Sequence, residues 1–175
     1  MSKLIVNEIQ APTGAAGLKM PAGSIVQVQS VQCGSSGNSL TVTAGSTWTD
    51  IPEATITFTP QFATSKLLIE TYQHCYLGNN STSTQWSSVN LRIMAGSTNL
   101  SNIDANATDY YAATYGGDNS REMAYALESA YYSPGSTAAV VYKVQMNFRH
   151  GSGGAASTIL NRYARGMVKI MEITQ

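Results

Sequence analysis

A histidine beside a cysteine is the first pair of side chains in this sequence that could do chemistry. His74 and Cys75 are adjacent in an apolar stretch, and His150 precedes a glycine-rich run. A cysteine–histidine dyad needs its two side chains within hydrogen-bond reach, whereas adjacent residues of a strand point to opposite faces. We therefore expect a packed Cys75 thiol and a partly exposed His74 imidazole, not a nucleophilic dyad.

Acidic side chains offer a second chemistry, the hydrolysis of a glycosidic bond between two carboxylates. The candidates gather in sequence between two predicted strands: Asp104, Asp109, Asp118, Glu122 and Glu128. Sequence spacing does not show that two of them flank a sugar at the required separation of about 5–9 Å, and acids in polar loops are usually solvated. We expect no enzyme and assign no catalytic residue; a glycan-cleaving role remains the weaker alternative.

Metal and phosphate sites have characteristic spacings of their own. The chain contains none of the usual cysteine and histidine spacings of a metal site. Residues 151–154 (Gly-Ser-Gly-Gly) have no following lysine or helix, so they are typical of a hairpin tip and not of a phosphate cradle. We expect neither a metal nor a cofactor.

Aromatic and small polar residues make two predicted loops better candidates for binding. Residues 78–87 and 99–120 combine tyrosine or tryptophan with serine, threonine, glycine and asparagine. Antibody loops use this composition, because rigid rings supply contact area while small polar residues adapt their hydrogen bonds. The candidate receptor- or glycan-binding residues are Trp86, Asp109, Tyr110, Tyr111, Tyr115 and Asn119. The alternative is that these tyrosines pack against a neighbouring subunit, and composition does not decide between the two.

Composition limits the partners of these loops. The 175-residue chain is 43% apolar and 11% charged, with ten basic and ten acidic side chains. Zero net charge lacks the basic surplus of a nucleic-acid binder, and no apolar run approaches the roughly 20 residues of a membrane span. The opening residues do not form a signal-peptide core. We expect an intracellular product with neither nucleic acid nor membrane as a partner, and self-association because so few charges keep copies apart.

The size of the chain allows one domain with a full hydrophobic core. Chains of this length bury roughly 70% of the surface that they expose when unfolded, so disulfides are not required. In a reducing compartment the two cysteines, Cys33 and Cys75, are expected to be buried free thiols.

The first 23 residues differ from the remainder. A short apolar piece at residues 4–9 is followed by many glycines and prolines without a core-forming period. We predict an extended N-terminal arm at residues 1–23, a linker or a tether, and a separate folded domain at residues 24–175.

The folded domain carries strands with a period of two. Ala54, Ile56 and Phe58 alternate with threonines, and residues 140–148 alternate in the same way. Residues 66–76 are apolar on both faces and are predicted to lie centrally in a sheet. Further strands are expected at residues 24–33, 89–94 and 166–173. Several short strands and no long helix indicate an all-β, antiparallel sandwich, jelly-roll-like or immunoglobulin-like.

One segment conflicts with this pattern. Residues 119–122 resemble a helix cap, and the good helix formers at 123–128 follow it. Alternation of Met123, Tyr125 and Leu127 also suits a strand, and the turn-like residues 133–137 lead into the strand at Val140. We predict a strand over 120–132, because a hairpin with a clear second arm needs a first one.

Several stretches occur in a specific order along nearly the whole chain. They are residues 2–10 (Ser-Lys-Leu-Ile-Val-Asn-Glu-Ile-Gln), 55–60 (Thr-Ile-Thr-Phe-Thr-Pro), 63–69, 133–137, 142–145, 161–162 and 170–173. In this order they resemble the small fibre-like structural proteins of marine and cyanobacterial tailed phages. Each motif alone is a strand-and-turn pattern without catalytic residues.

The resemblance implies a virion fibre or tail-fibre component, assembled in the host cytoplasm and usually homotrimeric. It implies an arm that attaches to other tail or collar proteins, with Leu4, Val6 and Ile9 as apolar anchors, and a β-sandwich that faces a host glycan or protein. Outward residues of the end strands, such as Thr55, Thr57, Lys169 and Met171, would then lie between subunits or at the tip. The alternatives are an architectural collar, connector or head-decoration protein and, more weakly, a glycan-cleaving spike.

Overall fold

The computed structural model describes residues 21–34, 40–43, 47–79, 85–101, 110–114, 121–150, 156–160 and 165–175. These residues form strands and turns, and no helix is assigned among them. The strands are β1 (Ile25–Cys33), β2 (Leu40–Thr43), β3 (Thr49–Phe58), β4 (Lys66–Asn79), β5 (Gln85–Ala95), β6 (Thr98–Asn99), β7 (Tyr110–Thr114), β8 (Arg121–Tyr132), β9 (Val140–His150), β10 (Ala156–Leu160) and β11 (Gly166–Ile173).

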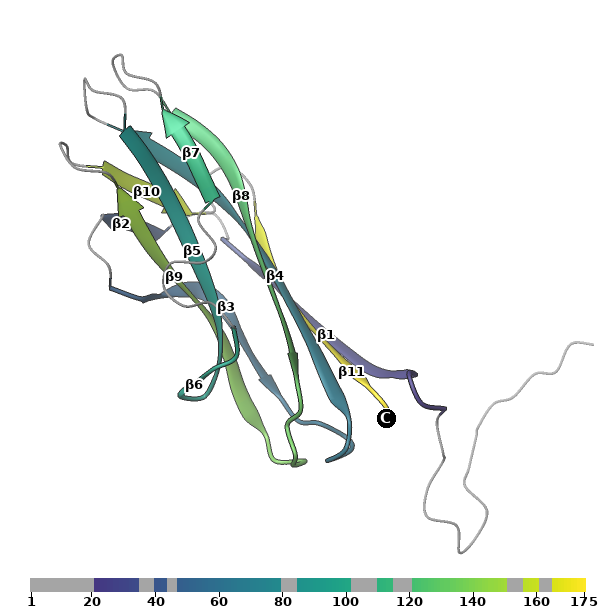
Figure 1. Ribbon diagram of the computed structural model, residues 1–175. Helices are drawn as coiled ribbons and strands as arrows, with labels where there is room; N and C mark the ends of the chain where they lie inside the picture. Colours follow the sequence, from purple (N-terminus) through teal and green to yellow (C-terminus); the bar gives the residue numbers. More distant parts are fainter. Residues whose placement is uncertain are drawn as a thin grey trace, which may run out of the picture.

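The strands form two antiparallel sheets that pack as a sandwich (Figure 1). Sheet A has the order β1-β11-β4, with β8 on the other side of β4 and with β10 and β2 continuing beside the far part of β4. Sheet B has the order β3-β9-β5, with β6 and β7 both pairing with β5. The prediction of an all-β antiparallel sandwich is confirmed.

The pairing identifies the sandwich as a jelly roll. When the short strands β2, β6 and β10 are set aside, the first strand pairs with the last, the second with the second last, and so on inward. The pairs are β1 with β11, β3 with β9, β4 with β8, and β5 with β7, all antiparallel. The chain is thus one long hairpin rolled into two sheets, which is the jelly-roll arrangement and not the immunoglobulin one.

Alternation along the strands builds the core between the sheets. Ala54, Ile56 and Phe58 of β3 are buried, whereas Thr55 and Thr57 between them are exposed. Tyr142 of β9 is fully buried, and its ring meets the Phe58 ring edge-on at 6.4 Å. The other large, fully buried apolar side chains are Leu67, Ile69, Ile93, Met146, Phe148 and Ile170. Both sheets contribute to this one core, as the period of two predicted.

The segment with helical propensity is a strand. Residues 121–132 form β8, in which twelve consecutive positions pair with β4, from Arg121 with Gly78 to Tyr132 with Leu67. β4 is central, since β8 lies on one side of it and β11 and β10 on the other. The predictions of a strand over 120–132 and of a central strand from residue 66 are both confirmed.

One surface prediction is wrong. His74, expected to be a partly exposed imidazole, is only 2% exposed. Its neighbour Cys75 is buried, as predicted, and so is Cys33. Burial lowers the pKa of His74 below its ordinary value, because desolvation disfavours the charged imidazolium. The periodicity of β4 did not predict the burial of His74, because this residue is one of the alternate residues of β4 that face away from the core.

Candidate functional site

The structure describes the backbone at three of the six predicted binding residues. Trp86 lies on β5 and pairs with Ala113 of β7, while Tyr110 and Tyr111 of β7 pair with Val89 and Ser88 of β5. These three residues therefore belong to one two-stranded ladder at the edge of sheet B. Asp109, Tyr115 and Asn119 lie outside the described residues, and so do the predicted arm anchors Leu4, Val6 and Ile9.

β6, where residues 99–120 begin, pairs with Met94 and Ala95 at one end of β5. The other strands that flank the predicted binding loops, β4, β5, β7 and β8, end together with β9 and β10 at the opposite end of the sandwich (Figure 1). Their terminal residues are joined by pairing: Asn79 with Ala156, Gly78 with Arg121, Gln85 with Thr114, and Ser87 with His150. We call this the distal end.

The described chain begins at the other end, which we call the proximal end. Gly23 donates a backbone hydrogen bond of 2.9 Å to Thr174, and Ile25 pairs with Ile173. Ile173 in turn pairs with Lys66, at the start of β4. The start of the described chain and these ends of β4, β5, β7 and β8 therefore lie at opposite ends of the domain (Figure 1).

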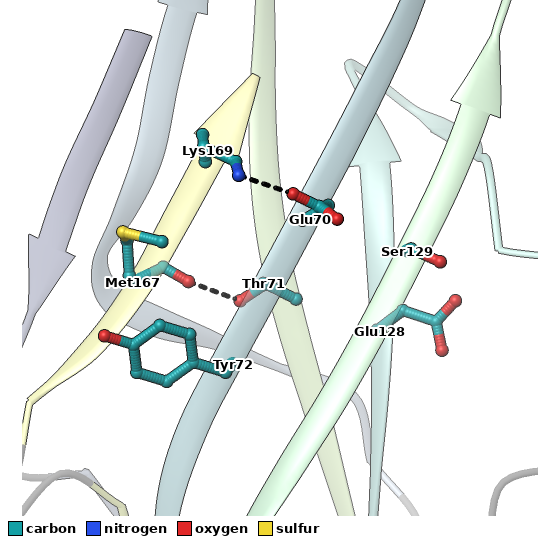
Figure 2. A pocket seen from close by; sticks show the side chains of 7 residues that line it. All are labelled: Glu70, Thr71, Tyr72, Glu128, Ser129, Met167 and Lys169. Atoms are coloured by element: carbon teal, nitrogen blue, oxygen red, sulfur yellow. Dashed lines mark hydrogen bonds and ion pairs between the residues drawn. The ribbon is translucent and has the colours of Figure 1, made fainter. Parts of the chain in front are cut away.

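A hollow of about 530 Å³ opens on sheet A between these two ends (Figure 2). It is lined by neighbouring positions of β4, β8 and β11: Glu70, Thr71, Tyr72, Glu128, Ser129, Met167 and Lys169. Glu70 pairs with both Lys169 and Ser129, and Tyr72 pairs with Met167. The hollow thus lies over three adjacent strands of a rigid sheet.

The side chains in the hollow are preorganised by contacts across strands. Lys169 and Glu70 form an ion pair of 2.7 Å, and the Thr71 hydroxyl donates a hydrogen bond of 2.9 Å to the Met167 carbonyl. The Tyr72 ring, which is 37% exposed, lies alongside Met167 (Figure 2). An exposed ring beside a neutralised charge pair can pack against an apolar or amphipathic group, such as a side chain of another subunit or a sugar ring.

The two carboxylates of the hollow do not form a hydrolytic pair. Glu70 pairs with Ser129, the residue next to Glu128 on β8. Because side chains alternate along a strand, Glu70 and Glu128 belong to opposite faces of sheet A. Burial raises the pKa of Glu128 above its ordinary value, against the opposing effect of hydrogen bonds from Ser129 and Ser101. Of the other acids considered for hydrolysis, Asp104, Asp109 and Asp118 lie outside the described residues.

An apolar row crosses the outer face of sheet A two residues from the ion pair. Val28 of β1 pairs with Met171 of β11, Met171 with Leu68 of β4, and Leu68 with Tyr131 of β8. Val28 and Tyr131 are 53% and 61% exposed. We call these four residues the apolar row. Sequence periodicity could not reveal it, because it depends on the register of four strands that are distant in sequence.

The outer face of sheet B is polar where its side chains are described. Arg92 Nε donates to Gln145 Oε1 at 2.7 Å, and Lys143 Nζ pairs with Asp50 Oδ2 at 2.9 Å. The Gln145 amide also donates to Asp50, and the Arg92 guanidinium stacks over the Trp48 ring at 4.4 Å. These polar groups satisfy one another, so this face differs in chemistry from the outer face of sheet A.

Metal and membrane features were also sought in the described part of the chain. Within it, no cluster of three or more histidine, cysteine, aspartate or glutamate side chains is arranged to hold a metal ion. It contains no helix that is both long and apolar enough to span a membrane.

Comparisons with known proteins give structural neighbours only. No family model and no curated protein matches the chain. Solved structures of infectious bursal disease virus align with 97–98% of the chain at 8% identity: a VP2 subviral particle with a TM-score of 0.41 and the Gx strain with 0.37. The chain spans only 43% and 42% of the length of those two chains. Similarity this low carries no conclusion about function.

Proposed function

We propose that this chain is a non-enzymatic structural protein of a virus particle, a fibre-like module that works as a homotrimer. Residues 1–23 tether it to other tail or collar proteins of the particle, and its distal end contacts a glycan or protein of the host surface. The observation that carries the proposal is the two-ended form of the jelly roll, with the start of the described chain at one end and the β5–β7 ladder of Trp86, Tyr110 and Tyr111 toward the other (Figure 1).

Two separate ends suit a fibre, because attachment and recognition then do not compete for one surface. At the proximal end, Thr174 holds the start of the described chain through Pro21, Gly23 and Ser24. At the distal end, Trp86, Tyr110 and Tyr111 belong to the β5–β7 ladder. Jelly rolls serve both as virus-shell domains and as lectins, so the fold is compatible with both roles without assigning either.

Self-assembly is supported by the surface chemistry. The chain has no net charge, and only 11% of its residues are charged, which leaves little repulsion between copies. The apolar row is open to solvent in the single chain. Three copies around one axis would also multiply weak host contacts into an avidity that no single site provides.

A triple substitution of the predicted binding tyrosines tests the proposal. Particles carrying Tyr110→Ala, Tyr111→Ala and Tyr115→Ala are expected to assemble normally and to adsorb to host cells at least tenfold less. Matched particles carrying Val141→Ala, on the outer face of sheet B, separate the loss of the predicted binding tyrosines from the loss of an exposed apolar side chain elsewhere. Normal adsorption of the triple variant on intact particles would contradict host contact through these tyrosines.

An architectural role is the second candidate, and the exposed apolar row favours it independently of the loops. A collar, connector or head-decoration protein would use its tyrosines and its apolar face for assembly alone. In that case the triple tyrosine variant would fail to enter particles. Electron microscopy of particles with the tagged chain distinguishes these locations from a fibre.

A glycan-cleaving spike is the third and weakest candidate. The carboxylates of the hollow lie on opposite faces of the sheet, which gives this reaction no support. Release of saccharide products from purified host polysaccharide by the isolated protein would establish it.

A further inference from the structure

We propose that the outer face of sheet A is the surface that a second copy of this chain covers. This inference deepens the proposed homo-oligomeric function and rests on it, since it names the face through which the copies meet. The face consists of the outward residues of β1, β11, β4 and β8, and it holds the apolar row. Five of the residues that line the hollow also lie on it: Glu70, Tyr72, Ser129, Met167 and Lys169 (Figure 2).

Exposed apolar side chains concentrate on this face. The large apolar side chains that remain exposed among the described residues are Ile25, Val28, Phe62, Tyr72, Tyr131 and Val141. Four of them lie on the outer face of sheet A, and only Val141 lies on that of sheet B. Isolated exposed apolar residues are ordinary, but a contiguous patch with polar surroundings marks an interaction surface.

The pairing register of the four strands makes this apolar patch contiguous. The apolar row has one residue on each of four adjacent strands, and Ile25 and Ile173 pair on the proximal side of it. On the distal side, one polar position intervenes on each strand before Tyr72 and Met167. Side chains directly opposite each other in a ladder lie about 5 Å apart, so the row is a continuous apolar band.

Charge on the face does not oppose a second copy. Lys169 and Glu70 neutralise each other at 2.7 Å in the polar row beside the apolar row. The Lys66 ammonium lies 5.8 Å from the centre of the Tyr131 ring, at the proximal margin. An ion pair that is already formed costs less to bury than a lone charge. Sheet B, by contrast, presents the hydrogen-bonded network of Asp50, Arg92, Lys143 and Gln145.

The area of the face reaches the lower bound for a specific contact. Four strands at a spacing of about 4.8 Å and eight residues at about 3.3 Å each give a face roughly 20 Å wide and 25 Å long. This is about 500 Å² for each copy and about 1,000 Å² for two, which is the size that a specific protein interface should reach. The hollow of about 530 Å³ within the face gives room for a protruding side chain of the second copy.

Two exposed valines on opposite sheets provide a matched test. Val28 of β1 is 53% exposed on the face, and Val141 of β9 is 46% exposed on sheet B. We expect the wild-type full chain, measured by light scattering and sedimentation at micromolar concentration, to have a mass that is a multiple of 18.6 kDa. Val28→Glu is expected to weaken association by about tenfold or more, because it places an unpaired charge in the contact. Val141→Glu is expected to leave association unchanged.

A second substitution, on another strand, tests whether a loss of association comes from the contact surface and not from damage to β1. Met171→Glu changes another strand of the apolar row, and circular dichroism with thermal melting confirms that each variant remains folded. Association that survives both Val28→Glu and Met171→Glu in folded proteins would overturn this inference while leaving the proposed function intact. A wild-type chain that stays monomeric at 18.6 kDa up to high micromolar concentration would overturn the homo-oligomeric function itself, and this inference with it.

Discussion

At the scale of single residues, Glu172 of β11 is a buried acid that connects separate parts of the domain. Its carboxylate is fully buried on the core side of β11, where an acid is costly unless its oxygens are hydrogen-bonded. The backbone amides of Gln61 and Phe62 donate to it at 2.9 and 3.0 Å, the Ser65 hydroxyl at 2.6 Å, and the Gln27 amide at 2.8 Å. One side chain therefore joins β11 to β1 and to the loop between β3 and β4.

Replacing this carboxylate should be costly. We expect Glu172→Gln to lower the free energy of unfolding at pH 7 by about 2–4 kcal/mol, since the amide leaves buried donors unsatisfied. Urea denaturation measures the change. Glu70→Gln is the matched control: Glu70 is 42% exposed and pairs with Lys169 at the surface, so it should cost less than about 1 kcal/mol. Equal losses in the two variants would contradict the role of Glu172.

The pKa of Glu172 predicts how the stability of the domain changes at low pH. Burial alone raises the pKa of Glu172, but the hydrogen bonds from Gln61, Ser65, Phe62 and Gln27 outweigh it, so the pKa lies below the ordinary 4.5. A carboxylate whose pKa is lowered by folding stabilises the folded state above pH 4.5. That stabilisation is lost as the pH falls through the pKa that the carboxylate has in the folded state. The difference in stability between wild type and Glu172→Gln should therefore shrink below pH 4.5, and a constant difference would contradict this.

Tyr142 is a buried polar residue whose substitution, unlike that of Glu172, should not destabilise the domain. Its ring is fully buried, and its hydroxyl has no hydrogen-bond partner among the described residues. Tyr142→Phe should keep the ring contacts and remove an unsatisfied group, so we expect it to be neutral or to stabilise the domain by about 1 kcal/mol. Thermal melting at pH 7 measures the difference. A clear loss of stability would show that the hydroxyl has a partner after all.

Alkaline titration supplies an independent measurement on Tyr142. Burial, with a smaller effect of Tyr132, raises its pKa from 10.0 to about 12. A raised pKa means that this residue's contribution is complete below pH 10 and is lost as the pH rises toward 12. The Tyr142→Phe variant should therefore lose less stability than wild type between pH 10 and 12.

At the scale of elements, local sequence predicted the strands but not their partners. Alternation located β3 and β9, because an inward residue at every second position leaves a local signal. β8 is harder: its helix formers favour a helix locally, and twelve pairs with β4 outweigh that preference. Propensity is worth only tenths of a kcal/mol per residue, so tertiary pairing decides.

The candidate site was less predictable than the fold. The apolar row joins Val28 to Met171 and Leu68 to Tyr131, and only the jelly-roll register places them side by side. The burial of His74 on the face away from the core likewise leaves no signal in periodicity. The tyrosines of residues 110–111 were predicted as binding residues from composition, which requires no knowledge of pairing, and they stay a prediction.

The turn between β8 and β9 allows a prediction about an element boundary. Gly135 has φ of +64° there, and a Cβ added to it would meet nothing within 4 Å. The cost of Gly135→Ala is therefore conformational, about 1 kcal/mol, because residues with a Cβ rarely adopt this region. Gly135→Asn is the control and should cost less, since asparagine tolerates positive φ. Chemical denaturation of the two variants checks the order.

At the scale of the whole molecule, the proposed attachment and the proposed recognition use different ends of the domain. A long hairpin rolled on itself brings the start of the described chain and the C-terminal strand to one side, through β1 and β11, and leaves the strand ends near β5 and β7 at the other. Such a module can be anchored at one end without disturbing the surface at the other. The outer face of sheet A runs between the two ends, which suits contact between parallel copies.

The limit of the tether can be located by truncation. Pro21, Gly23 and Ser24, which the sequence assigned to the arm and the domain boundary, hold Thr174 through four hydrogen bonds of 2.6–3.1 Å. A chain that begins at Pro21 keeps these bonds and should match the full chain in stability. A chain that begins at Ile25 loses them and should be less stable by about 2–6 kcal/mol, at the net value of roughly 0.5–1.5 kcal/mol for each of the four bonds. Both truncated chains should fail to enter particles, because both lack Leu4, Val6 and Ile9. Particle incorporation of the chain that begins at Pro21 would place the tether in the folded domain, and a loss of stability in that chain would make residues 1–20 part of the fold.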